Sequence, residues 1–280
     1  MKIIRKKNEL QAEIERLKSS GKSVGFVPTM GALHAGHIAL ANRCVAENDI
    51  CVVSVFVNPT QFNNPADLEK YPRNLENDAE LLRKAGCHII FAPEAAEMYD
   101  EKEINTTFDF DFGGLDKLME GKFRPGHFNG VVQVVSKLFD LVQPDKAYFG
   151  EKDFQQLAII HRMVKILKYP VEIVDCPIVR ELSGLAMSSR NERLNSEQRK
   201  KAVKISEVLF ESRNFANEKS PKELIRWVVD NINKVDGLEL EYYDIVDATS
   251  LQSLENWNNN CVGCVAVFCG DVRLIDNIRY

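Results

Sequence analysis

The chain has 280 residues, of which 45% are hydrophobic and 28% are charged. A chain of this length and composition can bury one large core or two smaller ones, which excludes a disordered, collagen-like or disulfide-held miniature protein. Its 36 Lys and Arg residues against 41 Asp and Glu residues give a formal net charge of -5. No strong positive field therefore attracts phosphate backbones, and we expect no nucleic-acid partner.

The apolar stretches are too short for a membrane segment. The longest, 50–57 and 262–269, fall far below the roughly 20 residues that cross a bilayer. The N-terminus has a basic start but no apolar stretch behind it, unlike a secretory signal. We therefore expect a cytoplasmic protein with no membrane partner.

Strands and helices alternate through the first 176 residues. Apolar patterns predict helices over 7–19, 36–47, 76–84, 131–142 and 154–168, and strands over 23–27, 50–57, 88–91, 147–149 and 171–174. A polar loop is expected over 58–73. Strands that alternate with helices of this length predict right-handed crossovers and a doubly wound parallel sheet.

The pattern changes after Pro177. Two helical patterns, 196–213 and 221–232, precede three consecutive strand candidates, 238–246, 262–268 and 272–275. Short polar turns between the strands predict a small antiparallel sheet packed by helices. We expect an α/β fold with domains 1–176 and 177–280, the second a smaller α+β domain.

The seven cysteines are an odd number and lie mostly among apolar residues, which predicts reduced, buried thiols. Cys261 and Cys264 form a C-x-x-C that could bind metal or act in redox chemistry. No second pair or nearby His completes a ligand set, so a core strand is favoured.

The first strand of the alternation leads directly into PTMGALHAGH, residues 28–37. Backbone N–H groups at such a strand-to-helix turn can bind an anion. The Gly31 to Gly36 spacing suggests a phosphate loop, but His37 stands where a Walker A motif needs Lys. His34 and His37 share one helical face and could donate to phosphate oxygens. In isolation, a pair of surface histidines that cap the helix is the alternative.

Two further polar segments carry candidate chemistry. LAMSSRN (185–191) could clamp a triphosphate, and FGEKDFQQ (149–156) places Lys152, Asp153 and Gln156 after a strand. Each has an ordinary structural alternative: a solvated linker or helix cap for the first, and a polar helix N-terminus capped by Asp for the second.

Together with SVFVNPTQF (54–62), YPRN (71–74) and GKFRPGHFNGV (121–131), these segments resemble the pantothenate synthetase (pantoate–β-alanine ligase) family in order and spacing. That family belongs to nucleotidyltransferases similar to class I aminoacyl-tRNA synthetases, with HAGH in place of HIGH and MSSR in place of KMSKS. The resemblance implies a Rossmann-like domain that binds ATP and pantoate, a C-terminal lid and a homodimer.

The resemblance also implies an activity. Members use ATP and Mg²⁺ to condense (R)-pantoate with β-alanine through pantoyl adenylate, releasing AMP and pyrophosphate. His34, His37, Lys152 and Arg190 are the implied catalytic residues, with His37 the candidate proton donor to the leaving group. Gln61 and Gln156 would hold pantoate, Gln61 also lying where β-alanine enters, and Lys122, Arg124 and His127 lie in a stretch that would wall off the cavity. The implied ATP contacts are Met30, Gly31, Ala32, Leu33, His34, Ala35, Gly36, His37, Gly150, Glu151, Lys152, Asp153, Val179, Met187, Ser188, Ser189 and Arg190.

The magnesium ligands do not transfer in the same way. Some relatives have an Asp-rich run after YPR, whereas this chain reads NLENDAE, with Glu76 and Asp78 as the acidic candidates. We expect Mg²⁺ to be bound chiefly by the ATP phosphates, with no protein ligand assigned.

Three other functions fit parts of the sequence. A nucleotidyltransferase for a phosphorylated substrate would share HAGH, but it would need more basic residues and would not explain VNPTQF. A fragment that loads tRNA conflicts with the acidic composition. A non-catalytic nucleotide-binding module conflicts with the intact set of motif residues.

Overall fold

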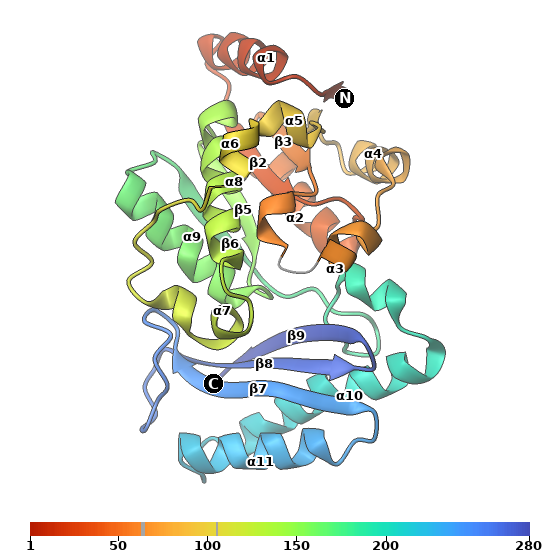
Figure 1. Ribbon diagram of the computed structural model, residues 1–280, viewed down its shortest axis with the longest axis vertical. Helices are drawn as coiled ribbons and strands as arrows, with labels where there is room; N and C mark the ends of the chain where they lie inside the picture. Colours follow the sequence, from red (N-terminus) through yellow and green to blue (C-terminus); the bar gives the residue numbers. More distant parts are fainter. Residues whose placement is uncertain (63–64, 105) are drawn as a thin grey trace. The chain divides into compact units, whose positions relative to one another are not determined.

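The computed structural model describes residues 1–62, 65–104 and 106–280, which form two compact units (Figure 1). The first unit consists of 1–113, 124–150 and 159–176, and the second of 114–123, 151–158 and 177–280. The longest segment of the second unit begins at Pro177, where the sequence pattern changes. Segments 114–123 and 151–158, which the sequence assigned to the first domain, instead pack with the second unit.

A six-stranded parallel sheet forms the centre of the first unit. Its spatial order is β1-β4-β3-β2-β5-β6, and every neighbouring pair is parallel. The strands are β1 (Lys2–Ile4), β2 (Val24–Thr29), β3 (Ile50–Val55), β4 (Ile89–Phe91), β5 (Lys146–Gly150) and β6 (Glu172–Cys176). The order reverses at β2, as in a doubly wound sheet, so the predicted architecture is confirmed.

Strand β1 is the one strand of this sheet that the sequence analysis missed. It has three residues, of which only Ile4 is buried, so no alternating pattern marks it. It pairs with β4 at the edge of the sheet. The remaining strands agree with the predicted ones within a few residues.

The predicted helices of the first unit are present. They are α1 (Lys7–Ser19), α2 (Ala35–Glu47), α4 (Leu75–Lys84), α8 (His127–Val142) and α9 (Phe154–Leu167), the last running from the second unit into the first. Short helical segments occur at η1 (Pro59–Gln61), α3 (Pro65–Lys70), α5 (Ala95–Met98) and α6 (Glu101–Ile104). The predicted loop over 58–73 therefore contains η1 and α3, while 63–64 lie outside the described residues. Across the described chain, no helix is long and apolar enough to span a membrane.

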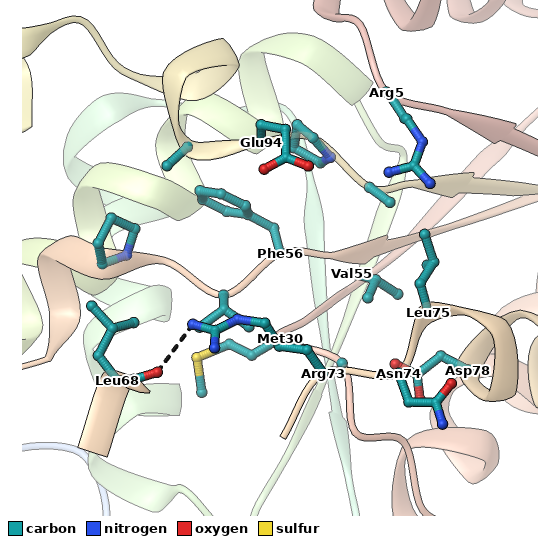
Figure 2. Close-up of a pocket in the computed structure, with 16 residues that line it drawn as sticks. Arg5, Met30, Val55, Phe56, Leu68, Arg73, Asn74, Leu75, Asp78 and Glu94 are labelled. Atoms are coloured by element: carbon teal, nitrogen blue, oxygen red, sulfur yellow. Dashed lines mark hydrogen bonds between the residues drawn. The ribbon is translucent and has the colours of Figure 1, made fainter. Parts of the chain in front are cut away.

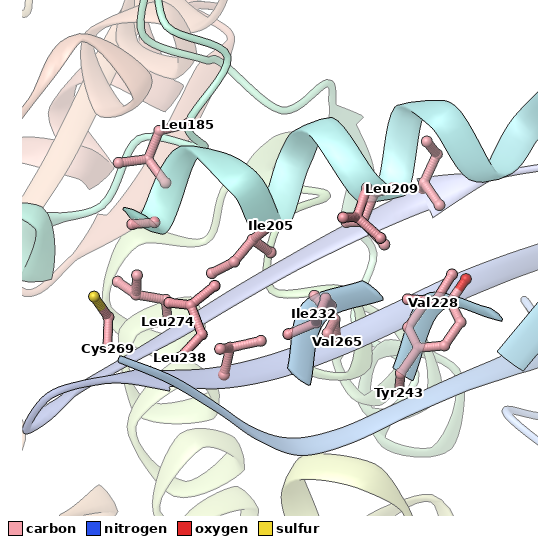
Figure 3. Close-up of a cluster of buried hydrophobic side chains, with 14 of the residues drawn as sticks. Leu185, Ile205, Leu209, Val228, Ile232, Leu238, Tyr243, Val265, Cys269 and Leu274 are labelled. Atoms are coloured by element: carbon pink, nitrogen blue, oxygen red, sulfur yellow. The ribbon is translucent and has the colours of Figure 1, made fainter. Parts of the chain in front are cut away.

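The second unit contains the predicted antiparallel sheet, formed by β7 (Leu238–Asp247), β8 (Cys261–Cys269) and β9 (Val272–Arg279). Helices α10 (Ser196–Ser212) and α11 (Pro221–Asn233) begin at the capping boxes of Asn195 with Gln198 and of Ser220 with Glu223. Figure 3 shows Ile205 and Leu209 of α10 in one hydrophobic cluster with Val265 of β8. Burial of this cluster fixes the two helices against one face of the sheet.

Polar contacts attach the two short segments to the second unit. Gln155, in the first turn of α9, donates to the carbonyl oxygens of Leu115 (2.6 Å) and Leu118 (2.8 Å). Arg273 of β9 forms ion pairs with Glu120 of α7 (Met119–Phe123; 3.2 Å) and with Glu241 of β7 (2.6 Å). These long-range contacts explain why 114–123 and 151–158 pack with residues more than a hundred positions away.

Cys261 and Cys264 lie on opposite faces of β8, because side chains three positions apart in a strand point to opposite sides. Cys261 packs in the cluster with α10 and α11, and Cys264 packs in a different cluster with Met119 and Phe154. Burial raises the pKa of the Cys264 thiol. All seven cysteines, which fall within the described residues, are buried free thiols, as predicted.

We expect Arg273→Met to lower the free energy of unfolding of the second unit by roughly 3–5 kcal/mol, because Glu120 and Glu241 would lose their shared cation in a poorly solvated site. The chain's two tryptophans, Trp227 and Trp257, both belong to this unit, so tryptophan fluorescence during urea unfolding follows it.

Arg226→Met on the exposed side of α11 is the matched control, with an expected change within about 0.5 kcal/mol. A loss below about 1 kcal/mol for Arg273→Met would mean that the two carboxylates are solvated without it.

Candidate active site

The loop that follows β2 is shaped by two residues with left-handed backbone. Gly31 has φ +81° and Ala32 has φ +50°. Before the turn, the Thr29 hydroxyl donates to the Ser54 carbonyl oxygen (2.6 Å) and accepts from the Gly31 N–H (3.2 Å). The ends of β2 and β3 are thereby tied together, and the chain reverses into α2 at the point where the strand order switches.

Asp78 of α4 holds this loop in place. Its carboxylate accepts from the Ala32 N–H (3.0 Å) and the Leu33 N–H (2.8 Å), and the residue is only 1% exposed. A Cβ on Gly31 would lie 2.9 Å from the Asp78 Oδ2 atom, so glycine is needed there for space as well as for conformation. Asp78 thus supports the loop backbone.

The other acidic candidate, Glu76, is exposed on the first turn of α4. Among the described residues, no group of three or more His, Cys, Asp or Glu side chains is arranged to hold a metal ion. The donor set present therefore does not fit a metal held by the protein itself.

His34 and His37 cap the N-terminus of α2 reciprocally. The Gly36 N–H donates to His34 Nδ1 (3.1 Å), and the His34 N–H donates to His37 Nδ1 (3.3 Å). A ring nitrogen that accepts a hydrogen bond carries no proton, so the proton of each ring lies on Nε2. The ring centroids are 4.1 Å apart. The capping role, which sequence analysis treated as the alternative to a functional one, also makes both Nε2–H groups donors.

Gln61 is held on both sides. It lies in η1, is 8% exposed, donates from Nε2 to the Met30 sulfur (3.0 Å) and accepts at Oε1 from Asn58 Nδ2 (3.1 Å). Its backbone carbonyl accepts from His127 Nδ1 (2.8 Å), while Arg124 contacts His127 Nε2 at 3.1 Å. Of the three predicted cavity residues in 113–130, Arg124 and His127 lie with Gln61, whereas Lys122 belongs to the second unit.

Asn58 and Tyr99 form a buried support behind Gln61. Asn58 is 1% exposed and donates to the Gly130 carbonyl oxygen (3.1 Å), while the Tyr99 hydroxyl donates to Asn58 Oδ1 (2.9 Å). Burial raises the pKa of the Tyr99 phenol, so it stays protonated and remains a donor. Asn58 stands inside the NPTQF motif, but no local pattern in the sequence indicates Tyr99, which comes from a distant segment.

The predicted residues around 150–156 are held at the start of α9. Gly150 ends β5, and Asn277 of β9 donates to the carbonyl oxygens of Glu151 (2.8 Å) and Lys152 (3.1 Å). The Lys152 ammonium pairs with the Asp153 carboxylate at 3.1 Å, and the Asp153 carbonyl accepts the first helical N–H, from Leu157. The expected polar helix N-terminus is therefore present.

Gln156 is half-buried and makes no side-chain hydrogen bond to the described residues. Its neighbour Gln155 instead clamps the segment 115–121, so the two adjacent glutamines have different surroundings.

Val179 and the MSSR segment are brought together in the second unit. Met187 N–H donates to the Val179 carbonyl (2.9 Å), and Arg180 forms a bidentate pair with Asp276 (2.7 and 2.8 Å). The Ser188 hydroxyl accepts from the Arg190 N–H (3.2 Å) and caps the short helical turn η3 (Ser189–Arg193). The helix-cap alternative considered for this segment is thus also present.

Two adjacent residues of β9 position both predicted segments of the second unit. Asn277 holds 151–152, and Asp276, which is 4% exposed, holds Arg180 at the base of the MSSR hairpin. Sequence analysis missed both residues, since their strand reads only as a core element.

A cavity of about 400 Å³ lies in the first unit beside the loop after β2 (Figure 2). Met30, Gly31, Val55 and Phe56 form part of its wall. The charged side chains that line it are Arg5, Arg73, Asp78 and Glu94. Parallel sheets bind their ligands at the carboxyl ends of the strands, which is where these residues lie.

We expect Asp78→Asn to weaken the loop before α2, because the amide can present only one acceptor to the two N–H groups and places a donor against the other. The predicted cost is about 1.5–3 kcal/mol in the free energy of unfolding, with faster hydrogen exchange at the Ala32 and Leu33 amides. Glu76→Gln, on the exposed side of the same helix, should leave that exchange unchanged. Unaltered protection in Asp78→Asn would show that the loop holds itself.

A family model described as pantoate–beta-alanine ligase matches residues 2–279. A pantothenate synthetase of Bacteroides fragilis strain YCH46 is 58% identical over 282 residues, covering 100% of this chain and 99% of that protein. The crystal structure of pantoate–beta-alanine ligase from Thermus thermophilus matches with a TM-score of 0.93 at 46% identity, covering 99% of both chains.

A pantoate–beta-alanine ligase from Francisella tularensis, complexed with beta-gamma ATP and β-alanine, matches with a TM-score of 0.82 at 36% identity. That match covers 99% of this chain and 97% of the other. With a family model over nearly every residue and relatives of this identity over the full length, the chain belongs to the pantoate–beta-alanine ligase family.

Proposed function

We propose that the protein condenses (R)-pantoate with β-alanine, using ATP and releasing AMP and pyrophosphate through a pantoyl-adenylate intermediate. The observation that carries the proposal is the loop 30–37, in which the start of α2 and two imidazole Nε2–H groups form a set of donors. Such a set suits the triphosphate of ATP. Membership of the family supports the choice of the other two substrates.

In the first step, a pantoate carboxylate oxygen attacks the α-phosphorus of ATP in line. A new P–O bond forms, the bond from the α-phosphorus to the bridging oxygen breaks, and pyrophosphate leaves. Because carboxylate and triphosphate are both anions, catalysis depends on positioning and on donors that stabilise charge on the leaving group. In the proposal, His34, His37, Lys152 and Arg190 supply these donors, and Met30–His37, Gly150–Asp153, Val179 and Met187–Arg190 hold ATP.

His37 acts in this scheme by donating a hydrogen bond. Its Nδ1 atom is the acceptor for the His34 N–H, which requires the neutral ring with its proton on Nε2. A neutral imidazole is a strong hydrogen-bond donor but a very weak acid. The cap therefore supports charge stabilisation at the leaving oxygen over complete proton transfer.

Gln61 and Gln156 would hold pantoate, since an amide can donate to a carboxylate and accept from a hydroxyl. The contacts of Gln61 with Met30 and Asn58 support this role, because they fix the amide before substrate binds. In the second step, the amine of β-alanine attacks the acyl carbon, the bond from that carbon to the AMP oxygen breaks, and the nitrogen loses a proton.

Mg²⁺ would reach this site with ATP, bound by the phosphates, and we route no step through a protein-held metal. We also propose, from the family resemblance, a cytoplasmic homodimer in which the second unit is the lid. Light scattering coupled to size exclusion tests the dimer directly.

The test of the activity is pyrophosphate release from ATP and Mg²⁺ with (R)-pantoate, measured with and without β-alanine, together with detection of AMP and pantothenate. Pantothenate and AMP in equal amounts are expected, with a burst of pyrophosphate when β-alanine is omitted. A folded preparation that binds ATP and shows no pantoate-dependent release would overturn the proposal.

We expect His37→Ala to lower kcat/KM for pantoate-dependent pyrophosphate release by roughly 100- to 1,000-fold, the usual cost of removing one donor at a developing anion. His37→Gln should recover part of the loss, because its Nε2 amide can donate, whereas a role in proton transfer would leave it as inactive as His37→Ala. His161→Ala, at an exposed histidine paired with Asp175, is the control and should retain full activity.

A further inference from the structure

The cavity beside the loop after β2 contains charged side chains that the proposed chemistry does not use. Figure 2 shows Arg5, Arg73 and Glu94 among the residues that line it, together with the apolar Val55, Phe56 and Leu75. A mainly apolar hollow with a few convergent polar groups is the usual form of a small-molecule site, and about 400 Å³ lies within the usual size range.

These charges are not neutralised by the part of the chain that the structure describes. Among the described residues, the side chains of Arg5 and Glu94 take part in no hydrogen bond or ion pair. Within the same residues, Arg73 donates only to the backbone carbonyl oxygens of Leu68 (3.0 Å) and Tyr71 (3.4 Å), so its charge has no carboxylate partner there. The fourth charged residue, Asp78, already accepts from two backbone N–H groups.

Two guanidinium groups and one carboxylate complement a small zwitterion. A guanidinium binds a carboxylate with paired, charge-assisted hydrogen bonds, and a carboxylate binds an ammonium. Pantoate has a carboxylate and hydroxyl groups but no ammonium, so it would leave Glu94 without a partner. Of the substrates in the proposed reaction, only β-alanine carries both charges.

The cavity also adjoins the residues proposed to hold pantoate. The Met30 side chain lines it, and the sulfur of Met30 accepts the hydrogen bond from Gln61. An amine bound here is therefore separated from Gln61 by one side chain, on the path toward the acyl group that it attacks.

We propose that this cavity is the subsite that receives β-alanine, with its carboxylate on Arg5 and Arg73 and its ammonium on Glu94. The inference rests on the proposed function and adds to it a set of specificity residues. Arg5 and Arg73 select the carboxylate end of the amine substrate, and Glu94 selects its charged amino end.

The test is the β-alanine dependence of pantothenate formation at saturating ATP and pantoate. Arg73→Gln and Arg5→Gln should each raise the KM for β-alanine roughly tenfold to a hundredfold, with a much smaller change in kcat, since a charge-assisted bond is lost in binding. Arg73→Lys should recover part of the loss. Arg83→Gln, an exposed arginine on α4 outside the cavity, is the matched control and should leave the KM unchanged.

A second measurement separates carboxylate recognition from general damage. The wild-type protein should prefer β-alanine to β-alaninamide, which lacks the carboxylate, and Arg73→Gln should reduce that preference at least tenfold. Glu94→Gln should raise the KM for both amines alike. Equal unfolding midpoints in urea establish that the variants are folded.

Pantoate-dependent pyrophosphate release without β-alanine distinguishes the two levels of the proposal. If the wild type lacks it, the proposed function fails and this subsite with it. If the wild type has it and the arginine variants lose it, the cavity takes pantoate and the β-alanine assignment is wrong. An unchanged KM for β-alanine in both arginine variants would equally overturn the assignment.

Discussion

The contact between the Asp78 carboxylate and the N–H groups of Ala32 and Leu33 is the constraint on which the first unit's site depends. A loop with two consecutive left-handed residues is costly unless its surroundings hold it. Asp78 supplies that hold from α4, a helix more than forty residues further along the chain. Once the loop is fixed, α2 begins at His34, and its N-terminus lies at the switch point of the sheet.

Helix capping and ligand binding use the same atoms in this loop. By accepting backbone N–H groups, the Nδ1 atoms of His34 and His37 stabilise α2 and also determine which ring nitrogen carries the proton. The structural and functional roles that sequence analysis set against each other are therefore compatible. The same holds for Ser188, whose hydroxyl caps a short turn inside the MSSR segment.

The second unit supports its candidate residues from the adjacent pair Asp276 and Asn277 on β9. Because neighbouring strand residues point to opposite faces, one strand can hold two separate segments with two successive side chains. Arg273, on the same strand, binds Glu120 and fixes a third segment. A strand that reads as core in the sequence is thus also the support for the polar segments 151–153 and 179–190.

The sequence by itself determined the β/α alternation, the antiparallel C-terminal sheet, the buried thiols and the motifs that mark the family, because each depends on local periodicity or on residues close together in the chain. It missed β1, whose three residues contain one buried position. Only the tertiary structure decided that Asp78 supports the loop, that Tyr99 stands behind Gln61, that Gln155 and not Gln156 clamps 115–121, and that 114–123 packs with the second unit. Each of these rests on a hydrogen bond or ion pair between distant segments, and the partner of a buried polar group is fixed only when folding brings it within reach.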